Sequence, residues 1–413
     1  MAELVVHDPY ASLRFRDYRT FLASTAAVSV ATQVQSAVLG WQVYELTRDP
    51  LALGFVGLAE ALPFLVLTFV GGWAADRVDR RALSLASLVA VGASGLALLL
   101  LSVGAPRSAL PFYAAQALAG LGRAFYRPAS VALGTELVAR EHYHNAATWR
   151  SSVFHVAQVL GPAVGGGLIA VGGPRVAYAV VVALSVVGLA TLGAIGRRPA
   201  RARAEAPGGL AAELSDGVRF VFREPVLLGA MSLDLFAVLF GGATALLPIF
   251  ARRLGVGEVG FGVLRAAPAV GSVAMSLALA RFGHFRRAGR VLLVSVALFG
   301  ITWVLFALSP WYALSLALLA IGGALDNVSV VLRSTLVQLW TPQDKMGRVS
   351  AVNGFFIGSS NELGAFESGL AARLLGTVAS VVFGGAMTLC TVALVAWRAP
   401  ALRRLEHLGK ARE

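Results

Sequence analysis

The feature that most constrains this chain is a series of apolar stretches, each long enough to cross a lipid bilayer. Residues 82–103 and 291–308, for example, contain no charged side chain. A hydrocarbon core about 30 Å thick requires roughly 20 apolar residues in a helix, which satisfies its own backbone hydrogen bonds. Charged residues make up only 14% of the 413 residues, and the mean hydropathy is +0.74. We therefore predict an all-α membrane protein.

The apolar stretches predict twelve spans in two near-equal halves. The spans cover approximately residues 20–44, 51–74, 82–104, 108–134, 145–171, 175–196, 225–251, 258–281, 290–309, 311–335, 347–373 and 376–397. We predict an N-terminal lobe of six helices (residues 1–196), a cytoplasmic linker (197–224) and a C-terminal lobe of six helices with a short cytoplasmic tail (225–413). Such a duplication is typical of secondary transporters with two pseudo-symmetric lobes around a central cavity.

The basic residues predict that both termini lie in the cytoplasm. Of 35 basic residues, five fall within spans and 24 fall at cytoplasmic ends or loops in this orientation. The six on the outside are Arg48, Arg107, Arg175, Arg252, Arg253 and Arg373. This asymmetry follows the positive-inside rule and predicts a multi-pass protein of the inner cell membrane.

The same distribution explains the net charge of +13 without a nucleic-acid partner. The single cysteine, Cys390, excludes an intramolecular disulfide and any metal site built from several cysteines. We expect no metal and no cofactor, and we expect a monomer whose partners are a small-molecule substrate, the lipid bilayer and protons as the coupling ion.

Ionisable residues occur within only some of the predicted spans. Spans 3, 6, 9 and 12 contain none, which indicates that the other eight surround a polar path. The residues concerned are Glu60, Asp234, Asp326, Glu362, Glu367, Arg123, Arg127, Arg150, Arg265, Arg333 and His155. A charge inside the membrane is costly and usually faces a partner or a water-filled cavity, so these positions are candidates for function.

Their depths predict two charged tiers, each with two acids and one arginine. At 1.5 Å per residue, Asp234, Asp326 and Arg123 lie about 13 Å or slightly more from the cytoplasmic helix ends. By the same measure, the second tier lies about 22–24 Å from those ends, and its members are Glu60, Glu362 and Arg265.

Two readings of the lower acids stay open, because Asp234 and Asp326 suit either a proton or substrate site or a structural pair with an arginine. Three other arginines lie near the inner ends of their spans, where the side chain is expected to extend toward the interface. These are Arg127, Arg150 and Arg333. His155 is a lone histidine, for which packing or hydrogen bonding is the simpler expectation.

The loop between the second and third spans reads GGWAADRVDRRALS, residues 71–84. It contains glycines that we expect to end one helix, then Asp76-Arg77 and the basic pair Arg80-Arg81. At this position the loop resembles the conserved cytoplasmic loop of the major facilitator superfamily. The resemblance implies that Gly72 and these charged residues form a conformational latch. Asp76 would contact a helix terminus of the other lobe, with Arg80 and Arg81 as its partners.

The fifth span contains Gly161-Pro162 followed by Gly165-Gly166. This pattern resembles the core of the antiporter motif found in exporters of the superfamily, although the upstream glycines of that motif are missing. This resemblance favours export over import, and close packing of a kinked helix is the alternative explanation of the same residues. The span-4 motif of proton-coupled drug exporters is poorly matched and retains only Arg123.

Across residues 13–398 the chain most resembles the enterobactin-exporter-like branch of the superfamily, above all in SSNELGAFESG, residues 359–369. The resemblance implies export of a siderophore or a similar amphipathic compound by proton antiport. The branch also contains drug and macrolide exporters, so multidrug efflux is the alternative. Other classes of protein are a lipid flippase of the same fold, a channel and a membrane-embedded enzyme. The sequence contains no HExxH, GxSxG or P-loop pattern that would support an enzyme.

We expect the two lobes to rock about the cavity while an acid exchanges protons and thereby changes the affinity for substrate. The candidates for proton coupling are, in order, Glu362, Asp234, Asp326 and Glu60, with Arg123 and Arg265 as counter-ions or contacts for an anionic substrate. Ring contacts to a substrate are possible at four aromatic positions, Trp41, Phe236, Phe355 and Phe356.

Two glutamates of the eleventh span differ in their expected roles. Glu362 and Glu367 are about 140° apart around a helix, so they do not share a face. Glu362 lies near mid-span on a face with small residues and is the functional candidate. Glu367 lies near the outer end, where we expect a structural role in which its side chain either extends to the interface or pairs with Arg373.

Overall fold

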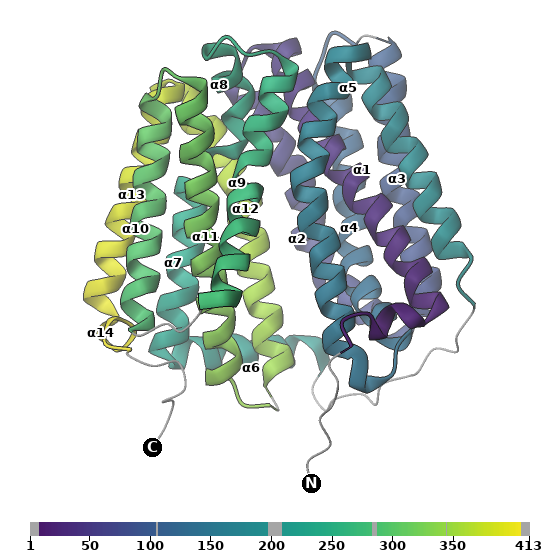
Figure 1. The fold of residues 1–413 in the computed structure, drawn as a ribbon, viewed down its shortest axis with the longest axis vertical. Coiled ribbons are helices and arrows are strands. Elements are labelled where there is room, and N and C mark those ends of the chain that lie inside the picture. The colour runs from purple at the N-terminus through teal and green to yellow at the C-terminus, as the bar shows by residue number, and fades with distance from the viewer. Residues whose placement is uncertain (1–7, 105, 197–208, 283–286, 344, 406–413) are drawn as a thin grey trace.

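The computed structural model describes residues 8–104, 106–196, 209–282, 287–343 and 345–405, which are helical apart from short connections (Figure 1). The helices are α1 (Arg16–Thr47), α2 (Pro50–Arg77), α3 (Arg80–Gly104), α4 (Leu110–Glu136), α5 (Tyr143–Gly193), α6 (Gly209–Arg223), α7 (Pro225–Gly241), α8 (Leu247–Arg253), α9 (Glu258–Phe282), α10 (Ala288–Leu308), α11 (Tyr312–Trp340), α12 (Met346–Leu375), α13 (Thr377–Arg398) and α14 (Pro400–Arg403). Three short 3-10 helices are η1 (Ala11–Arg14), η2 (Arg140–His142) and η3 (Ala243–Leu246). The predicted all-α class is confirmed.

Helix α5 is too long to cross a membrane once. Its 51 residues would extend about 76 Å as one straight helix, more than twice the thickness of the hydrocarbon core. The helical geometry is interrupted at Gly172 and Gly173, and Gly173 has a φ of +71°, which glycine adopts without a steric penalty. Pro174 then begins the second segment, where its missing N–H costs little. The break predicted between residues 171 and 175 is confirmed.

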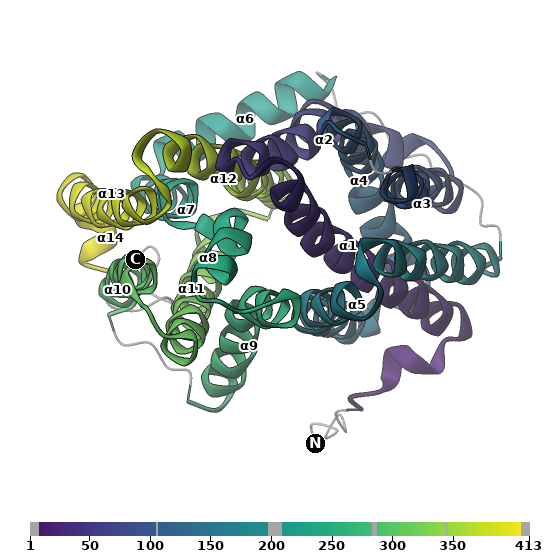
Figure 2. The same ribbon diagram turned by 90° about the horizontal axis from the view of Figure 1, so that it is seen from above.

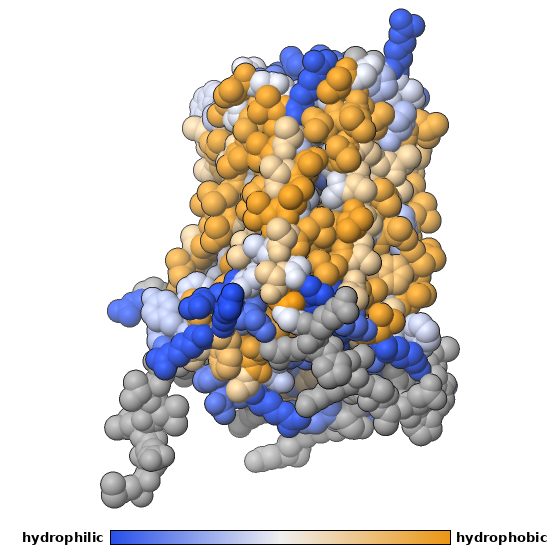
Figure 3. Space-filling view, turned by 90° about the vertical axis from the view of Figure 1, so that its right-hand side faces the viewer, coloured by the Kyte–Doolittle hydropathy of each residue, from blue (hydrophilic) through white to orange (hydrophobic). Residues whose placement is uncertain are grey.

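Nine segments of the described residues are long and apolar enough to cross a membrane, and α5 counts once among them. Helices α4 and α12 are not among the nine, although they have 27 and 30 residues, and they carry several of the charged side chains considered below. The count of twelve spans therefore stays a prediction. Figure 3 shows a broad apolar belt between two hydrophilic ends, as expected for a multi-pass membrane protein.

The long helices form two bundles. In the first bundle, α1 packs on α5, and α4 packs between α2 and α3. In the second bundle, α11 packs between α9 and α10, and α13 packs on α7 and α10. The bundles meet along two seams, α2 against α12 and α5 against α9, which Figure 2 shows on opposite sides of the molecule. The domain boundaries predicted at residues 196 and 225 stay a prediction, because residues 197–208 lie outside the described part.

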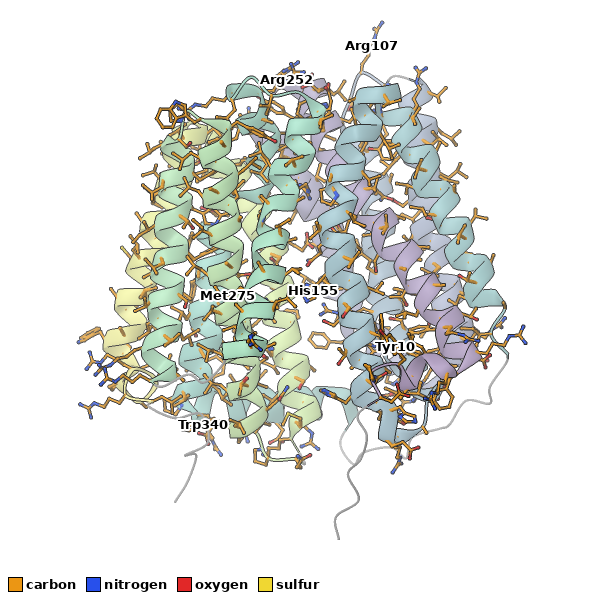
Figure 4. The ribbon with its side chains drawn as sticks, in the orientation of Figure 1. Tyr10, Arg107, His155, Arg252, Met275 and Trp340 are labelled. Atoms are coloured by element: carbon orange, nitrogen blue, oxygen red, sulfur yellow. The ribbon has the colours of Figure 1, made fainter. Side chains whose placement is uncertain are left out.

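The two bundles are joined at one end of the molecule. This end carries Arg107 and Arg252 in Figure 4 and is called the upper end here. One buried apolar core takes residues from both bundles there, including Trp41 of α1 and Phe261 of α9, whose rings are 5.1 Å apart. At the lower end each bundle has a separate core, represented by Phe21 in the first and Leu332 in the second. The bundles are therefore packed together above and are separate below.

Glycines allow this close contact at the upper end. A Cβ on Gly166 of α5 would lie 2.9 Å from the Cα of Gly262 in α9. A Cβ on Gly369 of α12 would lie 2.9 Å from the Cα of Gly54 in α2. Both seams thus bring helix backbones into contact, which a larger residue at any of these four positions would prevent.

Two ion pairs also join the bundles at the upper end. Arg373 of α12 lies 2.5 Å from Asp49, the residue that caps the N-terminus of α2. Arg252 of α8 lies 2.5 Å from Glu45 of α1. Of the two alternatives for Glu367, pairing with Arg373 is therefore wrong, because Arg373 extends across the seam to Asp49 of the other bundle.

Helix α6 crosses the lower end of the molecule, where α14 and Tyr10 also lie (Figures 1 and 4). Asp216 of α6 binds Arg348 at 2.6 Å and Lys345 at 3.1 Å, next to the start of α12. The two hydrogen bonds, first from Arg348 and then from Lys345, lower the pKa of Asp216 below its ordinary value of 3.8. These pairs therefore form at any pH above that value and weaken only as the pH falls through the lowered pKa.

Gly71 and Gly72, near the end of the second predicted span, do not end its helix, contrary to the sequence prediction. Helix α2 continues to Arg77, and Gly71 lies within it. A Cβ on Gly71 would lie 2.2 Å from the carbonyl oxygen of Ala124, so this glycine is required for α2 to contact α4. Gly72, by contrast, has open space where its Cβ would be.

We predict that Gly71→Ala destabilises the protein while Gly72→Ala does not. The added methyl group of Gly71→Ala forces α2 away from α4, and such overpacking costs about 1–3 kcal/mol. Gly72→Ala meets no neighbour and gains helix propensity of up to about 1 kcal/mol. Thermal unfolding of the two purified variants checks this, and equal midpoints would contradict the close contact between α2 and α4.

Candidate functional site

A charged cluster lies where the two bundles face each other. Arg123 of α4 forms an ion pair with Glu60 of α2, and its Nη1 atom lies 4.0 Å from Oε1 of Glu362 in α12. Helices α2 and α4 belong to the first bundle, and α12 belongs to the second. One guanidinium group is therefore shared by two carboxylates across the seam between the bundles.

The contact between α2 and α4 positions the first two members of the cluster. Gln116, Gly120 and Arg123 are separated by four and three residues, so they lie on one face of α4. A Cβ on Gly120 would lie 2.2 Å from the carbonyl oxygen of Glu60, which shows how closely the helices approach. At this distance the Gln116 amide donates a hydrogen bond of 2.5 Å to the Glu60 carboxylate.

A chain of amide and hydroxyl groups extends from Glu60 through the first bundle. Gln35 of α1 donates hydrogen bonds to Gln116 at 3.3 Å and to Ser94 of α3 at 3.1 Å. The Glu60 side chain is only 10% exposed, and its buried charge is compensated by the ion pair with Arg123. The hydrogen bond from the Gln116 amide fixes its position. Glu60 is therefore fully engaged within its own bundle.

Glu362 is less fully engaged. It lies within electrostatic range of Arg123 in the first bundle and of Arg265 in the second, and it accepts no hydrogen bond among the described residues. Arg265 of α9 donates a hydrogen bond of 2.8 Å to Ser36 of α1, which is a further contact between the bundles. Glu362 thus lies between two arginines, and a proton or a ligand can alter its charge without removing a buried hydrogen bond.

The structure corrects the tier predicted for Arg123. The sequence placed Arg123 at the depth of Asp234 and Asp326, whereas its guanidinium lies with Glu60 and Glu362. The prediction measured depth at the backbone, and a long arginine side chain displaces its charge by more than one helical turn. The cluster between the two bundles therefore holds two arginines and two glutamates, namely Arg123, Arg265, Glu60 and Glu362.

A second charged cluster lies inside the second bundle. Asp234 of α7 and Arg333 of α11 form an ion pair in which both residues are buried, at 5% and 3% exposure. The prediction that Arg333 reaches the inner interface is wrong, because α11 continues two turns past it to Trp340. Arg333 thus belongs to this buried cluster and does not lie at the inner interface, where the sequence prediction placed it.

Asp326 lies two turns before Arg333 on the same face of α11. It lines a cavity of about 150 Å³ among α7, α9, α10, α11 and α12, which it shares with Thr302 and Asn361. It also faces a smaller space beside Asp234. Within the described part of the chain Asp326 has no hydrogen bond and no ion pair, so it is an acid that faces open space inside the bundle.

The predicted latch loop is anchored within the first bundle. Arg80 binds Glu136 of α4 at 2.6 Å, and Arg81 donates a hydrogen bond of 2.6 Å to the carbonyl of Gly193 in α5. The carboxylate of Asp79 accepts the backbone N–H groups of Arg81 and Ala82 and caps α3, a role that the sequence analysis did not assign. Asp76 is exposed at the end of α2, and Arg77 lies over the ring of Trp73 at 4.5 Å. The latch role of this loop stays a prediction.

The glycine-proline pattern in α5 lies between two packing surfaces. A Cβ on Gly161 would lie 2.3 Å from the Cβ of Gln33 in α1, whereas Gly165 has only ordinary contacts. Gly166 faces α9 across the seam, and the carbonyl of Pro162 lies 2.6 Å from the Cβ position of Gly262. Close packing accounts for these residues, and an exporter-specific role stays a prediction.

The remaining candidates are mostly packed against other rings. Phe355 stacks on Phe69 of the first bundle at 5.3 Å, and Phe236 stacks on Phe240 at 6.3 Å. Phe356 packs against the core of the second bundle. His155 is half-buried beside Phe154 and lies between the bundles in Figure 4.

Comparison with known proteins gives one family over nearly the whole chain. A family model described as Transmembrane secretion effector, of the major facilitator superfamily, matches residues 7–411. The enterobactin exporter EntS of Salmonella choleraesuis (strain SC-B67) is 26% identical over 378 residues, which cover 88% of this chain and 87% of the relative. EntS of Shigella boydii serotype 18 (strain CDC 3083-94 / BS512) is 26% identical over 393 residues, which cover 91% and 90%.

Solved transporter structures share the fold. The POT family transporter PepTSo matches with a TM-score of 0.73 and 14% identity, covering 95% of this chain and 99% of that structure. A D-xylose-proton symporter matches with a TM-score of 0.73 and 12% identity, covering 95% and 100%. These matches confirm the predicted major facilitator fold. The family model and the curated relatives show that the protein is a transporter rather than an enzyme.

We predict that Arg333→Met strongly destabilises the protein, because it leaves Asp234 buried without its partner. Removing one member of a buried ion pair typically costs about 3–5 kcal/mol. The double variant Asp234→Asn/Arg333→Met removes both charges and recovers much of that loss. Arg348→Met, which removes a half-buried partner of Asp216 at the lower end, serves as the control and changes stability much less. Thermal unfolding measures all three, and a wild-type midpoint for Arg333→Met would contradict the pairing.

Proposed function

We propose that this chain, which belongs to the transmembrane secretion effector family of the major facilitator superfamily, exports a small amphipathic compound by proton antiport. The compound is of the siderophore type, in line with the relatives that are named enterobactin exporters. The observation that carries this proposal is the cluster of Glu60, Arg123 and Glu362, because it joins the two bundles through one shared arginine.

Glu362 is the proposed proton carrier. When Glu362 is ionised, it attracts Arg123 across the seam, and when it is protonated this attraction disappears while the Glu60 pair persists. The charge state of one side chain is thereby coupled to how firmly the bundles hold together at this seam. Asp326 and Asp234 are the next candidates, and Asp326 has the advantage of an open cavity beside it.

Alternating access is the proposed mechanism, with the bundles rocking about their shared upper contacts. The shared core and the two ion pairs at the upper end support this, because they close that end while the lower cores are separate. Opening the upper end breaks the pairs of Arg252 and Arg373. In that state the lower ends approach each other, and the exposed Asp76 can then act as the latch.

The proposed orientation places the lower end in the cytoplasm and the protein in the inner membrane as a monomer. The positive-inside distribution of the sequence supports this, because most basic residues belong to the loops and ends on the predicted cytoplasmic side, and α6 and α14 lie at the lower end. The pairs of the upper end would then face the outside.

We predict that Glu362→Gln abolishes uphill export and leaves the protein folded. The amide keeps the size of the side chain but no longer carries a proton, so a pH gradient cannot drive transport. The measurement is movement of enterobactin in proteoliposomes with an imposed pH gradient, alongside thermal unfolding. Glu367→Gln is the matched control, because it makes the same chemical change on the same helix, away from the shared arginine, and it retains export.

Wild-type export by Glu362→Gln would contradict the assignment of the carrier. Export of cationic drugs or macrolides in place of enterobactin would favour the multidrug alternative. Movement of labelled phospholipid between leaflets, without release of a soluble compound, would instead indicate a flippase.

A further inference from the structure

We propose that Arg127 of α4 and Arg150 of α5 form an anion-binding site in the lower half of the first bundle. The site takes the acidic group of the transported compound, such as a carboxylate, phosphate or sulfonate. This inference deepens the proposed function and rests on it for the source of the anion. It also replaces the expectation that both side chains extend to the membrane interface.

Arg127 lies on the inward face of α4. Gln116, Gly120, Arg123 and Arg127 follow one another at steps of four, three and four residues, which is one face of a helix. The first three of these contact Glu60 and therefore face α2 and the other bundle. Arg127 is one turn further toward the lower end on the same face.

Most of the exposed apolar side chains of α4 lie on another face. Leu110 and Leu121 are about 100° and 120° around the helix from Arg127, whereas the exposed Val131 is one turn below it and about 40° away. Arg127 is nevertheless exposed. An exposed side chain on the inward face of a membrane helix borders a water-accessible space between helices, where charged residues are tolerated.

Arg150 extends toward the same region from α5. Its Nη1 atom lies 3.9 Å from the Cβ position of Gly134 in α4, beside the Phe21 ring, and Gly134 is two turns below Arg127 on the same face of that helix. Arg127 is within electrostatic range of both Arg150 and Arg123. Three guanidinium groups therefore share this wall of the first bundle.

The acids nearby are already engaged. Glu60 is paired with Arg123, and Glu362 lies between Arg123 and Arg265. In the described part of the chain, neither Arg127 nor Arg150 has an ion pair with an acid. Two uncompensated cations inside a membrane are costly, and an anion lowers that cost. Arginine suits such a role because its planar fork binds carboxylate and phosphate oxygens in pairs.

The test uses two dyes that differ by one acidic group. 1-Anilinonaphthalene-8-sulfonate carries a sulfonate, and N-phenyl-1-naphthylamine has the same rings without it. Fluorescence titration of the full chain in phosphatidylcholine nanodiscs, with empty nanodiscs subtracted, measures the dissociation constant of each dye. Binding requires no pH gradient, so failure of this inference is distinguishable from failure of proton-driven export.

We expect Arg127→Gln and Arg150→Gln each to weaken binding of the sulfonate dye about tenfold or more, since a hydrogen bond to a charged group is lost. Binding of the uncharged dye stays within about twofold. Arg107→Gln makes the same change at the upper end and leaves both dyes unaffected. Arg127→Lys and Arg150→Lys keep the charge but lose the planar fork, so we expect them to weaken binding of the sulfonate dye less than the glutamine variants do. Unchanged binding of the uncharged dye shows that each variant is folded.

Phosphatidylglycerol in the nanodiscs distinguishes a lipid headgroup from the transported compound as the source of the anion. If this lipid competes with the sulfonate dye and stays bound to the wild type but not to the glutamine variants in native mass spectrometry, the anion is a headgroup. If the dye binds equally with and without it, the anion is the acidic group of the compound. Unchanged dye binding in the glutamine variants, equal weakening of both dyes, or no saturable binding to the wild type would overturn the site.

Discussion

The arrangement of this protein depends on the cost of an uncompensated charge in the hydrocarbon region of the membrane. A buried cation or anion requires a partner, and the partner determines which helices must lie together. Arg123 pairs with Glu60 of its own bundle, and the same guanidinium also lies close to Glu362 of the second bundle. Arg333 pairs with Asp234 inside the second bundle. In the described part of the chain Asp326, Arg127 and Arg150 have no such partner. Asp326 borders a cavity, and for the two arginines we propose a water-accessible space that an anion can enter.

Close backbone contact makes these pairings possible, and glycine sets where it occurs. Gly120 brings α4 onto the backbone of Glu60, and Gly71 brings α2 onto α4, so the first bundle is closely packed around its charged pair. Gly166 and Gly262 act between the bundles, where contact without interlocking side chains permits separation. Glycine thus allows close helix contacts both within one bundle and between the two bundles.

Much of the fold was predictable from the sequence, because apolar length and the break at Gly172 and Gly173 depend on local chemistry. The charged positions Glu60, Arg123 and Glu362 were also identified from the cost of placing them in a span. Their partners were not, since pairing depends on how helices distant in sequence pack. Arg333 was misassigned because the end of α11 was placed too early, and Arg123 because its side chain changes the depth of its charge. The polar chain of Gln35 and Gln116 gave no signal, since neutral amides do not interrupt an apolar stretch strongly.

Burial alone does not decide which acid suits the coupling of protons to movement. Asp234 is the more deeply buried acid, but its partner Arg333 belongs to the same bundle, so their separation does not change when whole bundles move. Asp326 faces a cavity, yet the helices around it also belong to one bundle. Glu362 alone among these three has its arginine partner on the opposite side of a seam. A proton on Glu362 changes the force between two moving parts, whereas a proton on either aspartate changes the interior of one part. On this physical ground we rank Glu362 first.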